Sequence, residues 1–246
     1  MNQPIPNLSL SLSESAAREF YDRWIGRNGI SSLLGRLIFK LSGSVYARTF
    51  VREAQLVASD RVLELGCGLG TILTACQRLV QSRETYVGID LSYEMIKRAR
   101  LNSHPTALHG RTEFFLGSAI DLPLLDESFD VVLLSHMVKY LADVQFSRVL
   151  SEARRVLKDG GKIVLWEFAP FISSQVSNFI VRQVGGQKLR SAEEIREPLE
   201  NAGFRDLRLF HIVTPWVPWR NVAFCGRVSG NLIPSNESRT KECVIS

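Results

Sequence analysis

The stretch Val62–Gly70, which runs VLELGCGLG, carries the strongest structural signal in the chain. Its first residues are mostly apolar and predict a short buried strand, which leads directly into Gly66, Gly68 and Gly70. Alternating glycines at the end of a strand predict a tight turn that opens a helix, because glycine tolerates backbone conformations that other residues avoid. Such a turn lets a nucleotide-like ligand approach backbone N–H groups and the positive end of the helix. A dinucleotide fingerprint would have its third glycine at position 71, where this chain has Thr71.

Strand-like and helix-like segments alternate from Arg61 onward, which is typical of an α/β sheet wound with crossover helices. The apolar runs are short, as expected of parallel strands that are covered on both faces. We expect strands over residues 61–65, 85–89, 112–116, 129–134 and 162–166, and helices over 72–80, 93–102 and 144–158. The DGG sequence at 159–161 is expected to end the last of these helices.

The pattern changes after Trp166 and predicts a helix followed by two strands. Ser191 is expected to cap the helix, with Glu194 at the capping-box position and Pro198 as a bending or destabilising residue inside it. The strands are expected over residues 205–213 and 221–228. Because only the TPWVPWR segment lies between them, we expect them to pair antiparallel at the edge of the sheet.

The composition is that of an ordinary globular protein, with 246 residues of which 45% are hydrophobic and 22% charged. We expect a single domain, with a helical cap over 1–55, a core over 56–230 and a flexible tail over 231–246. The four cysteines form no CxxC pair and no spacing suited to zinc, so neither a metal nor a disulfide framework is expected. The N-terminus lacks the pattern of a secretion signal, and no window approaches the ~18 apolar residues of a membrane span. These features predict a cytoplasmic protein.

The net charge of +5 arises mainly in the flanks of the chain, where basic residues outnumber acidic ones. These basic residues do not form a run with interleaved aromatics, which disfavours nucleic-acid binding. A mild attraction to an anionic membrane surface or substrate stays open.

Asp90 follows the expected strand over 85–89, about twenty residues after the glycine loop. A carboxylate at this position can accept hydrogen bonds from both hydroxyls of a ribose. The alternative is that Asp90 only caps the following helix, but Ser92 is better placed for that role. We therefore predict that Asp90 binds a ribose.

Five stretches follow one another between residue 61 and about residue 213. They are VLELGCGLG, VGIDLSYEMIKRAR, FFLGSAIDLPLLDESFDVVLLSHMVKYL, EARRVLKDGGKIVLWEF and LRSAEEIREPLENAGF. In this order and spacing the chain resembles the class I S-adenosylmethionine-dependent methyltransferases, particularly those that modify small molecules, quinones or lipids. The resemblance implies an enzyme that uses S-adenosyl-L-methionine. It also implies a three-layer, Rossmann-like α/β fold with a seven-stranded, mostly parallel sheet, an antiparallel last strand and an N-terminal helical cap.

The same resemblance implies which residues bind the cofactor. Glu64 and the backbone of Gly66 to Gly70 would surround its methionine part. Asp90 would hold the ribose, and Leu91 would pack on the adenine.

Position 118 departs from the family pattern. Ser118 stands where the family often has an aspartate that accepts a hydrogen bond from the adenine amino group, and a serine accepts that bond without charge. Ala119 and Ser135 complete the expected set of cofactor-binding residues.

Methyl transfer from a sulfonium is an in-line displacement that depends on positioning and needs no metal or catalytic triad. A general base helps only where the acceptor must lose a proton. His136 is the candidate base, because it follows the expected strand over 129–134 and so lies at the carboxyl edge of the sheet. The alternative is that His136 starts the next helix or lines the pocket. In the family's usual layout Tyr21 and Trp24 would line the acceptor pocket, with a place in the core as the alternative.

Apolar residues recur at helical spacing over 30–41 and predict either a cap helix packed on the domain or a lid that meets a lipophilic substrate. This segment, the aromatic TPWVPW loop and the basic flanks favour a small lipophilic acceptor, methylated on O, N or C. A quinone precursor, a lipid, a terpenoid and a polyketide all fit that description. The last residues, Cys243–Ser246, fit a prenylation pattern, with an unstructured tail as the alternative.

Two other functions compete with methyl transfer. A nicotinamide or flavin oxidoreductase is disfavoured by Thr71 and by the expected terminal hairpin. A non-catalytic member of the fold, which binds the cofactor or a partner, stays open because of Ser118.

Overall fold

The computed structural model describes residues 12–26, 46–103, 110–170, 173–182, 185–212 and 221–229. Three predicted features lie outside these residues: the apolar segment over 30–41, the TPWVPW loop and the C-terminal tail with Cys243. The side chain of Trp24 lies outside them as well. The division of the chain into cap, core and tail therefore stays a prediction.

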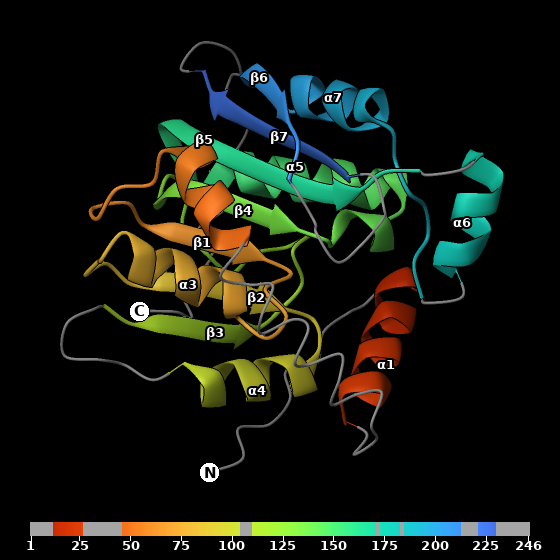
Figure 1. Ribbon diagram of the computed structural model, residues 1–246, viewed down its shortest axis with the longest axis horizontal. Helices are drawn as coiled ribbons and strands as arrows, with labels where there is room; N and C mark the ends of the chain where they lie inside the picture. Colours follow the sequence, from red (N-terminus) through yellow and green to blue (C-terminus); the bar gives the residue numbers. More distant parts are fainter. Residues whose placement is uncertain are drawn as a thin grey trace.

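The centre of the fold is a seven-stranded sheet with the order β3-β2-β1-β4-β5-β7-β6 (Figure 1). Its strands are β1 (Val62–Leu65), β2 (Tyr86–Asp90), β3 (Thr112–Leu116), β4 (Phe129–Ser135), β5 (Leu157–Phe168), β6 (Phe204–Phe210) and β7 (Asn221–Val228). Strands β1 to β5 are parallel, and β7 is antiparallel to both β5 and β6. The predicted mostly parallel sheet with an antiparallel last strand is confirmed.

The expected antiparallel pair at the edge of the sheet is confirmed: β6 pairs antiparallel with β7, and β7 lies between β5 and β6. One detail of the sheet differs from the sequence prediction. The helix expected over 144–158 ends at Val156, and the DGG sequence lies inside β5. The reason is that Leu157 is fully buried and pairs with Phe129 of β4. This pairing starts β5 at Leu157, before the two glycines. The pairing with β4 then shifts, which accommodates the extra residues.

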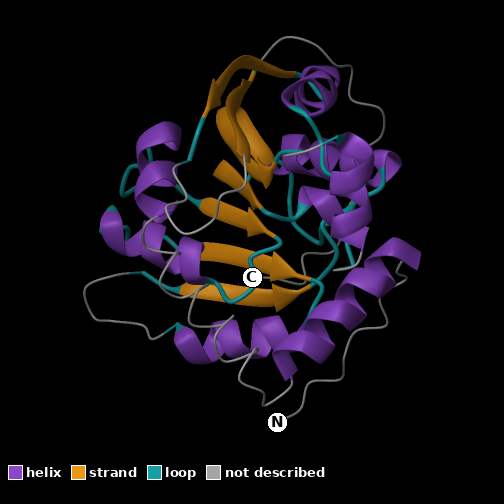
Figure 2. Ribbon diagram, turned by 45° about the vertical axis from the view of Figure 1, so that its right-hand side comes forward, coloured by secondary structure: helices purple, strands orange, loops and turns teal. Residues whose placement is uncertain are grey.

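Helices cover both faces of the sheet and complete the predicted three layers (Figure 2). On one face, α5 (Asp143–Val156) and α7 (Ala192–Asn201) bury Phe146 and Leu199 against strand residues such as Leu63. On the other face, a helix over 46–54, α3 (Thr71–Leu79) and α4 (Tyr93–Asn102) bury Phe50 and Leu73. Burial of these apolar side chains is the main stabilising contribution to the fold.

The two central strands direct their helices to opposite faces. Helix α3 follows β1 and packs on one face, whereas α5 follows β4 and packs on the other. In a wound α/β sheet this divergence opens a crevice at the carboxyl ends of the strands, which is where ligands bind. Helices α1 (Leu12–Gly26) and α6 (Ser174–Arg182) lie beyond this end of the sheet (Figure 1). Helix α1 contacts α4 and the short 3-10 helix η1 (Val138–Tyr140), so it lies next to the expected site.

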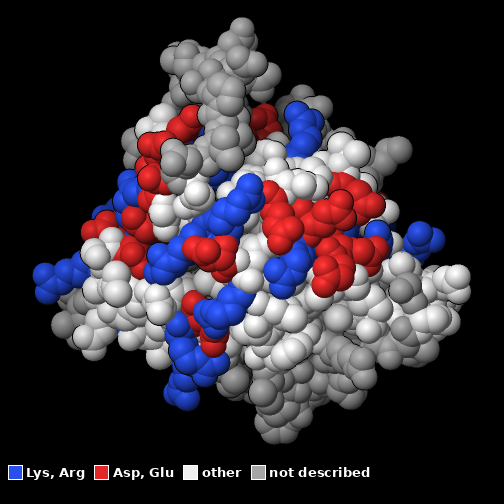
Figure 3. Space-filling view, turned by 90° about the horizontal axis from the view of Figure 1, so that it is seen from above, with Lys and Arg blue, Asp and Glu red and all other residues white. Residues whose placement is uncertain are grey.

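The surface does not present one sign of charge. On the face shown in Figure 3, acidic and basic side chains are interspersed, and acidic ones gather on one side. Helix α7 carries four exposed glutamates: Glu193, Glu194, Glu197 and Glu200. Within the described part of the chain, this face offers no continuous basic surface to a polyanion. No helix among the described residues is long and apolar enough to cross a membrane.

Candidate functional site

The glycine loop joins β1 to α3 in the predicted place, with its glycines in conformations that other residues rarely adopt. Gly66 and Gly70 both have φ of +68°. A Cβ atom at Gly66 would lie 2.7 Å from the Met137 side chain, and one at Gly70 would lie 2.3 Å from the Phe114 ring. Glycine is therefore required at both positions by conformation and by space.

The loop differs from the prediction in where its N–H groups point. The N–H groups of Gly66 and Cys67 donate to the Ile89 carbonyl at 2.8 and 3.1 Å. The Gly68 N–H donates to the Asp90 carboxylate at 2.8 Å, and the Gly70 N–H donates to the Cys67 carbonyl at 2.9 Å. These N–H groups already have acceptors within the protein. A ligand would therefore pack closely against the loop without accepting hydrogen bonds from them.

Asp90 ends β2 beside the glycine loop, as predicted. One carboxylate oxygen accepts from Gly68 and the other accepts from the Ser92 N–H, both at 2.8 Å. Burial raises the pKa of Asp90 to about 6, and these backbone hydrogen bonds offset part of that shift. Ser92 is the residue that caps α4, accepting from the Met95 N–H. Ser92, and not Asp90, is therefore the N-cap residue of this helix. Leu91, between them, is partly buried.

Glu64 is a buried carboxylate near the carboxyl end of β1. It is 1% exposed, and the Ser135 hydroxyl donates to its Oε1 at 2.7 Å. Burial raises the pKa of Glu64 to about 8, which the Ser135 hydroxyl and the nearby Leu73 N–H reduce only in part. Its Oε2 makes no hydrogen bond of normal geometry within the described residues. A buried acceptor of this kind suits a ligand that brings a donor or a positive charge.

Ser118 lies in the loop after β3 and contacts a carboxylate, that of Glu14, which was not predicted from the sequence. Its hydroxyl donates to Oε1 of Glu14 at 2.5 Å and accepts from the Ile120 N–H at 3.2 Å. Glu14 belongs to α1 and is 2% exposed. Ala119 is buried in the core cluster that includes Leu65.

Helix α1 makes further polar contacts at this end of the sheet. The Ser92 hydroxyl and the Glu94 backbone N–H donate to the Asp22 carboxylate at 2.5 and 3.2 Å. The Tyr21 and Tyr140 hydroxyls are hydrogen-bonded at 2.5 Å, and burial raises the pKa of both phenols. Tyr21 therefore faces η1 at the site edge, where the sequence predicted an acceptor-pocket residue.

His136 follows β4 at the carboxyl edge of the sheet, as predicted, and lies among aromatic and charged groups. Its ring centroid is 3.8 Å from that of Trp166 and 4.1 Å from that of Phe168, on which it stacks. Its Nδ1 lies 3.3 Å from Oε1 of Glu167, the penultimate residue of β5. Lys139 Nζ lies 3.2 Å from the same oxygen. Burial lowers the pKa of His136 below 6.5.

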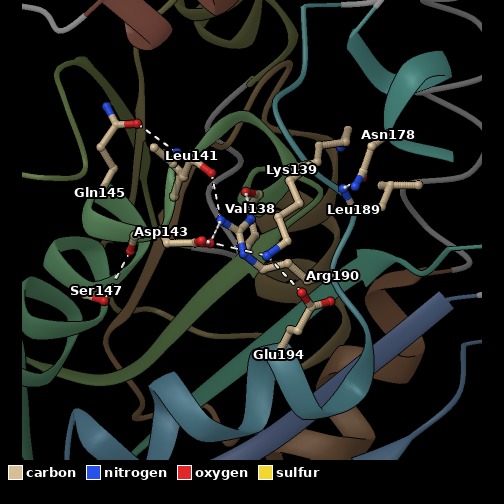
Figure 4. Close-up of polar contacts among 12 residues, drawn as sticks. Val138, Lys139, Leu141, Asp143, Gln145, Ser147, Asn178, Leu189, Arg190 and Glu194 are labelled. Carbon is tan, nitrogen blue, oxygen red and sulfur yellow. Dashed lines mark hydrogen bonds and ion pairs between the residues drawn. The ribbon is translucent and has the colours of Figure 1, made fainter. Parts of the chain in front are cut away.

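Arg190 holds the segment that carries Lys139 (Figure 4). Its side chain is almost fully buried and donates to the carbonyls of Val138 and Leu141, each at 2.8 Å, and to the Asp143 carboxylate at 2.7 Å. The guanidinium also lies 5.1 Å from the centre of the Phe146 ring. Arg190 therefore fixes η1 and the start of α5.

Replacing Arg190 with Met is expected to lower the free energy of unfolding by about 3 kcal/mol, because buried acceptors lose their donors. Chemical denaturation measures this loss. The Arg23→Met variant is the control, because Arg23 pairs with Glu19 on the exposed surface of α1 and is expected to contribute less than about 1 kcal/mol. A loss at Arg190 as small as that at Arg23 would contradict this role.

Sequence reasoning missed Glu14, Asp22, Tyr140 and Glu167. Glu14 lies two helical turns before Tyr21 and Asp22, so the three share one face of α1. That spacing is a signal that could have marked a polar face. Of the predicted residues, the structure brings Glu64 and Ser135 into contact, and Asp90 with the glycine loop. No cluster of three or more metal-ligating side chains occurs among the described residues.

Comparisons with known proteins find similar sequences and similar folds. A family model described as a methyltransferase domain matches residues 63–165, from β1 into β5. The demethylmenaquinone methyltransferase of Lactobacillus johnsonii is 26% identical over 184 residues, which span 66% of this chain and 75% of that protein.

Two solved structures share the fold. A chain from a complex that contains the Haloferax volcanii Trm112 methyltransferase activator has a TM-score of 0.72 at 20% identity, covering 88% of this chain and 99% of that one. The magnesium protoporphyrin IX methyltransferase of Synechocystis PCC 6803 with bound SAM has a TM-score of 0.63 at 16% identity, covering 91% of this chain and 100% of that one.

Proposed function

Because this chain belongs to the class I S-adenosylmethionine-dependent methyltransferases, we propose that it methylates a small, lipophilic and aromatic acceptor such as a quinone precursor. The observation that carries the proposal is the set of rings around His136 at the carboxyl edge of the sheet. Trp166 and Phe168 pack against the imidazole, and the Tyr21–Tyr140 pair lies on the η1 side. Of these rings, those of Phe168, Tyr21 and Tyr140 are partly exposed and favour a flat apolar partner, whereas Trp166 is fully buried. The paired tyrosine hydroxyls offer such a partner a polar contact.

The residues fit the cofactor. S-adenosylmethionine supplies a methyl group on a positively charged sulfur, together with an amino acid part and an adenosine. Glu64, whose buried Oε2 makes no hydrogen bond of normal geometry with the described residues, would accept from the amino group of the amino acid part. Asp90 would accept from the ribose hydroxyls. His136 would take a proton from a hydroxyl of the acceptor, which raises the electron density of an aromatic ring for methylation on oxygen or carbon.

Calorimetry with S-adenosylmethionine, S-adenosylhomocysteine and NADH tests the cofactor. We expect both sulfur compounds to bind and NADH to fail. Transfer of a labelled methyl group is then measured against a demethylated quinone precursor, a phospholipid and a hydroxylated terpenoid. Binding of NADH without either sulfur compound would refute the proposal, and transfer to the phospholipid alone would refute the aromatic acceptor.

Binding of S-adenosylmethionine at pH 7 is expected to release up to about one proton. The pKa of Glu64 is raised to about 8, so this carboxyl is mostly protonated in the free protein. A bound ammonium lowers that pKa and expels the proton. Calorimetry in buffers of different ionisation enthalpy measures the release. S-adenosylhomocysteine carries the same amino group and should release as much, and the absence of any release would count against Glu64.

Position 118 has a serine where the family often has an aspartate, but the Glu14 carboxylate lies next to it. We expect this carboxylate to favour adenine binding. The Glu14→Gln variant should bind S-adenosylmethionine roughly fivefold more weakly, since a charged acceptor contributes about 1 kcal/mol more than a neutral one. Glu19→Gln is the matched control, because Glu19 lies on the exposed side of the same helix. Equal affinities of the two variants would show that Glu14 has only a structural role.

A further inference from the structure

We propose that Glu167 is a positioning residue, which holds the His136 imidazole as the Nδ1–H tautomer and leaves Nε2 as the proton acceptor. This inference rests on the proposed function, because it concerns the base proposed there. Its main test needs neither a cofactor nor an acceptor, so the two can fail separately.

The contacts of Glu167 identify it as an ionised acceptor. It is fully buried, and among the described residues its partners other than the His136 ring are all donors. Its oxygens accept from the backbone N–H groups of Lys139 at 3.0 Å and Phe168 at 2.8 Å, and from Lys139 Nζ at 3.2 Å. Burial alone would raise the pKa of Glu167, but the Lys139 ammonium and the His136 contact hold it at about 2. An ionised carboxylate has no proton to give, so His136 Nδ1 must carry the hydrogen in their 3.3 Å contact.

The ring is held so that the two nitrogens cannot exchange places freely. Trp166 and Phe168 flank the imidazole, and the backbone N–H of His136 donates to the backbone carbonyl of Trp166 at 2.8 Å. The backbone of His136 has φ of +55°, a conformation that costs a non-glycine residue about 1 kcal/mol or more. Turning the ring over would lose the Glu167 contact and leave the carboxylate opposite a carbon atom. The neighbouring strands β4 and β5 therefore fix both the position and the orientation of the imidazole.

Burial, assisted by the Lys139 charge, keeps His136 neutral at neutral pH. The titratable groups facing this cluster are Lys139 and Tyr140 from η1, Glu167 from β5 and Tyr21 from α1. Burial and the Lys139 charge lower the pKa of His136, and Glu167 opposes them only in part. Burial raises the pKa of both phenols, so they stay uncharged. A neutral imidazole with hydrogen on Nδ1 presents a lone pair on Nε2.

The proton balance of the proposed step is simple. The O–H bond of the acceptor breaks, its electron pair stays on the acceptor oxygen, and a new N–H bond forms at Nε2. The imidazole becomes a cation, which the Glu167 carboxylate stabilises. In this arrangement Glu167 does not itself take up a proton.

Long-range nitrogen–proton NMR of the protein with ¹⁵N-labelled histidine tests the tautomer directly. The chain has four histidines, and the His136→Asn variant assigns the signal. At neutral pH we expect a protonated Nδ1 and a bare Nε2, whereas free histidine in water prefers the reverse. A bare Nδ1 in the unaltered protein would overturn the proposal.

Two variants give opposite expectations for the titration of His136 in the same spectra. Glu167→Gln removes a negative charge, so the pKa of His136 should fall, and turnover should fall about tenfold or more once an acceptor is known. Lys139→Met removes a positive charge, so that pKa should rise while the Nδ1–H tautomer persists. A purely structural role for Glu167 predicts no opposite shifts. An unchanged His136 titration in Glu167→Gln, or a loss of the Nδ1–H tautomer in Lys139→Met, would overturn the proposal.

Discussion

The Asp90→Ala variant is expected to bind S-adenosylmethionine about 100-fold more weakly than the unaltered protein, a change of about 3 kcal/mol. The reason is that, in the proposed role of Asp90, two ribose hydroxyls would lose a charged acceptor, and each hydrogen bond to a charged group contributes about 1.5 to 3 kcal/mol. The variant also leaves the Gly68 and Ser92 N–H groups without their acceptor. Calorimetry measures the affinity, and circular dichroism checks that the fold survives.

The pH dependence of binding gives a second readout of Asp90. Its pKa of about 6 means that the carboxyl becomes protonated as the pH falls through 6, so the affinity for the cofactor should fall over the same range. Asp159→Ala is the control, because Asp159 is an exposed aspartate on β5 and its loss should leave the affinity unchanged. If Asp90→Ala binds as tightly as Asp159→Ala, Asp90 does not hold the ribose.

The His136→Asn variant is expected to lose about 100- to 10,000-fold in kcat with an acceptor that must give up a proton, the usual range for removal of a general base. Its affinity for S-adenosylmethionine should stay within about twofold, because its proposed partner is the acceptor and not the cofactor. Since the pKa of His136 lies below 6.5, the base is available at neutral pH, and kcat should fall only as the pH drops below that value. Rates measured across pH report both effects.

A second histidine serves as the control for His136. His211 is exposed and follows β6, away from the glycine loop, so His211→Asn should leave turnover unchanged. If His136→Asn kept full turnover at every pH, the acceptor would not need a base from this residue, and the alternative that His136 only lines the site would hold.

The sheet could be predicted because each of its strands is marked by a local pattern. The apolar run before Gly66 predicted β1, and the run at 129–134 predicted β4 to within one residue. The cap of α7 was equally local, with the Ser191 hydroxyl accepting from the Glu194 N–H as expected. Patterns of this kind need only a few consecutive residues, so the sequence alone is enough.

The contacts of α1 could not be predicted in the same way. Glu14 meets Ser118 across 104 positions of sequence, and Asp22 meets Ser92 across 70. No spacing rule relates residues so far apart, because their meeting depends on where the helix lies against the finished sheet. Glu167 was missed for a related reason. Its proposed role depends on its contact with His136, which follows the neighbouring strand β4 and is distant in sequence.

The internal hydrogen bonds of the glycine loop lower the conformational entropy that the protein loses when a ligand binds. Because Gly66, Gly68 and Gly70 already donate to partners within the protein, the loop has its final shape before a ligand arrives. A preorganised loop loses little conformational entropy on binding, so that cost falls on the ligand and on the side chains that reach it. Loosening the loop at Asp90 would therefore weaken binding twice, through a lost contact and through a new ordering cost.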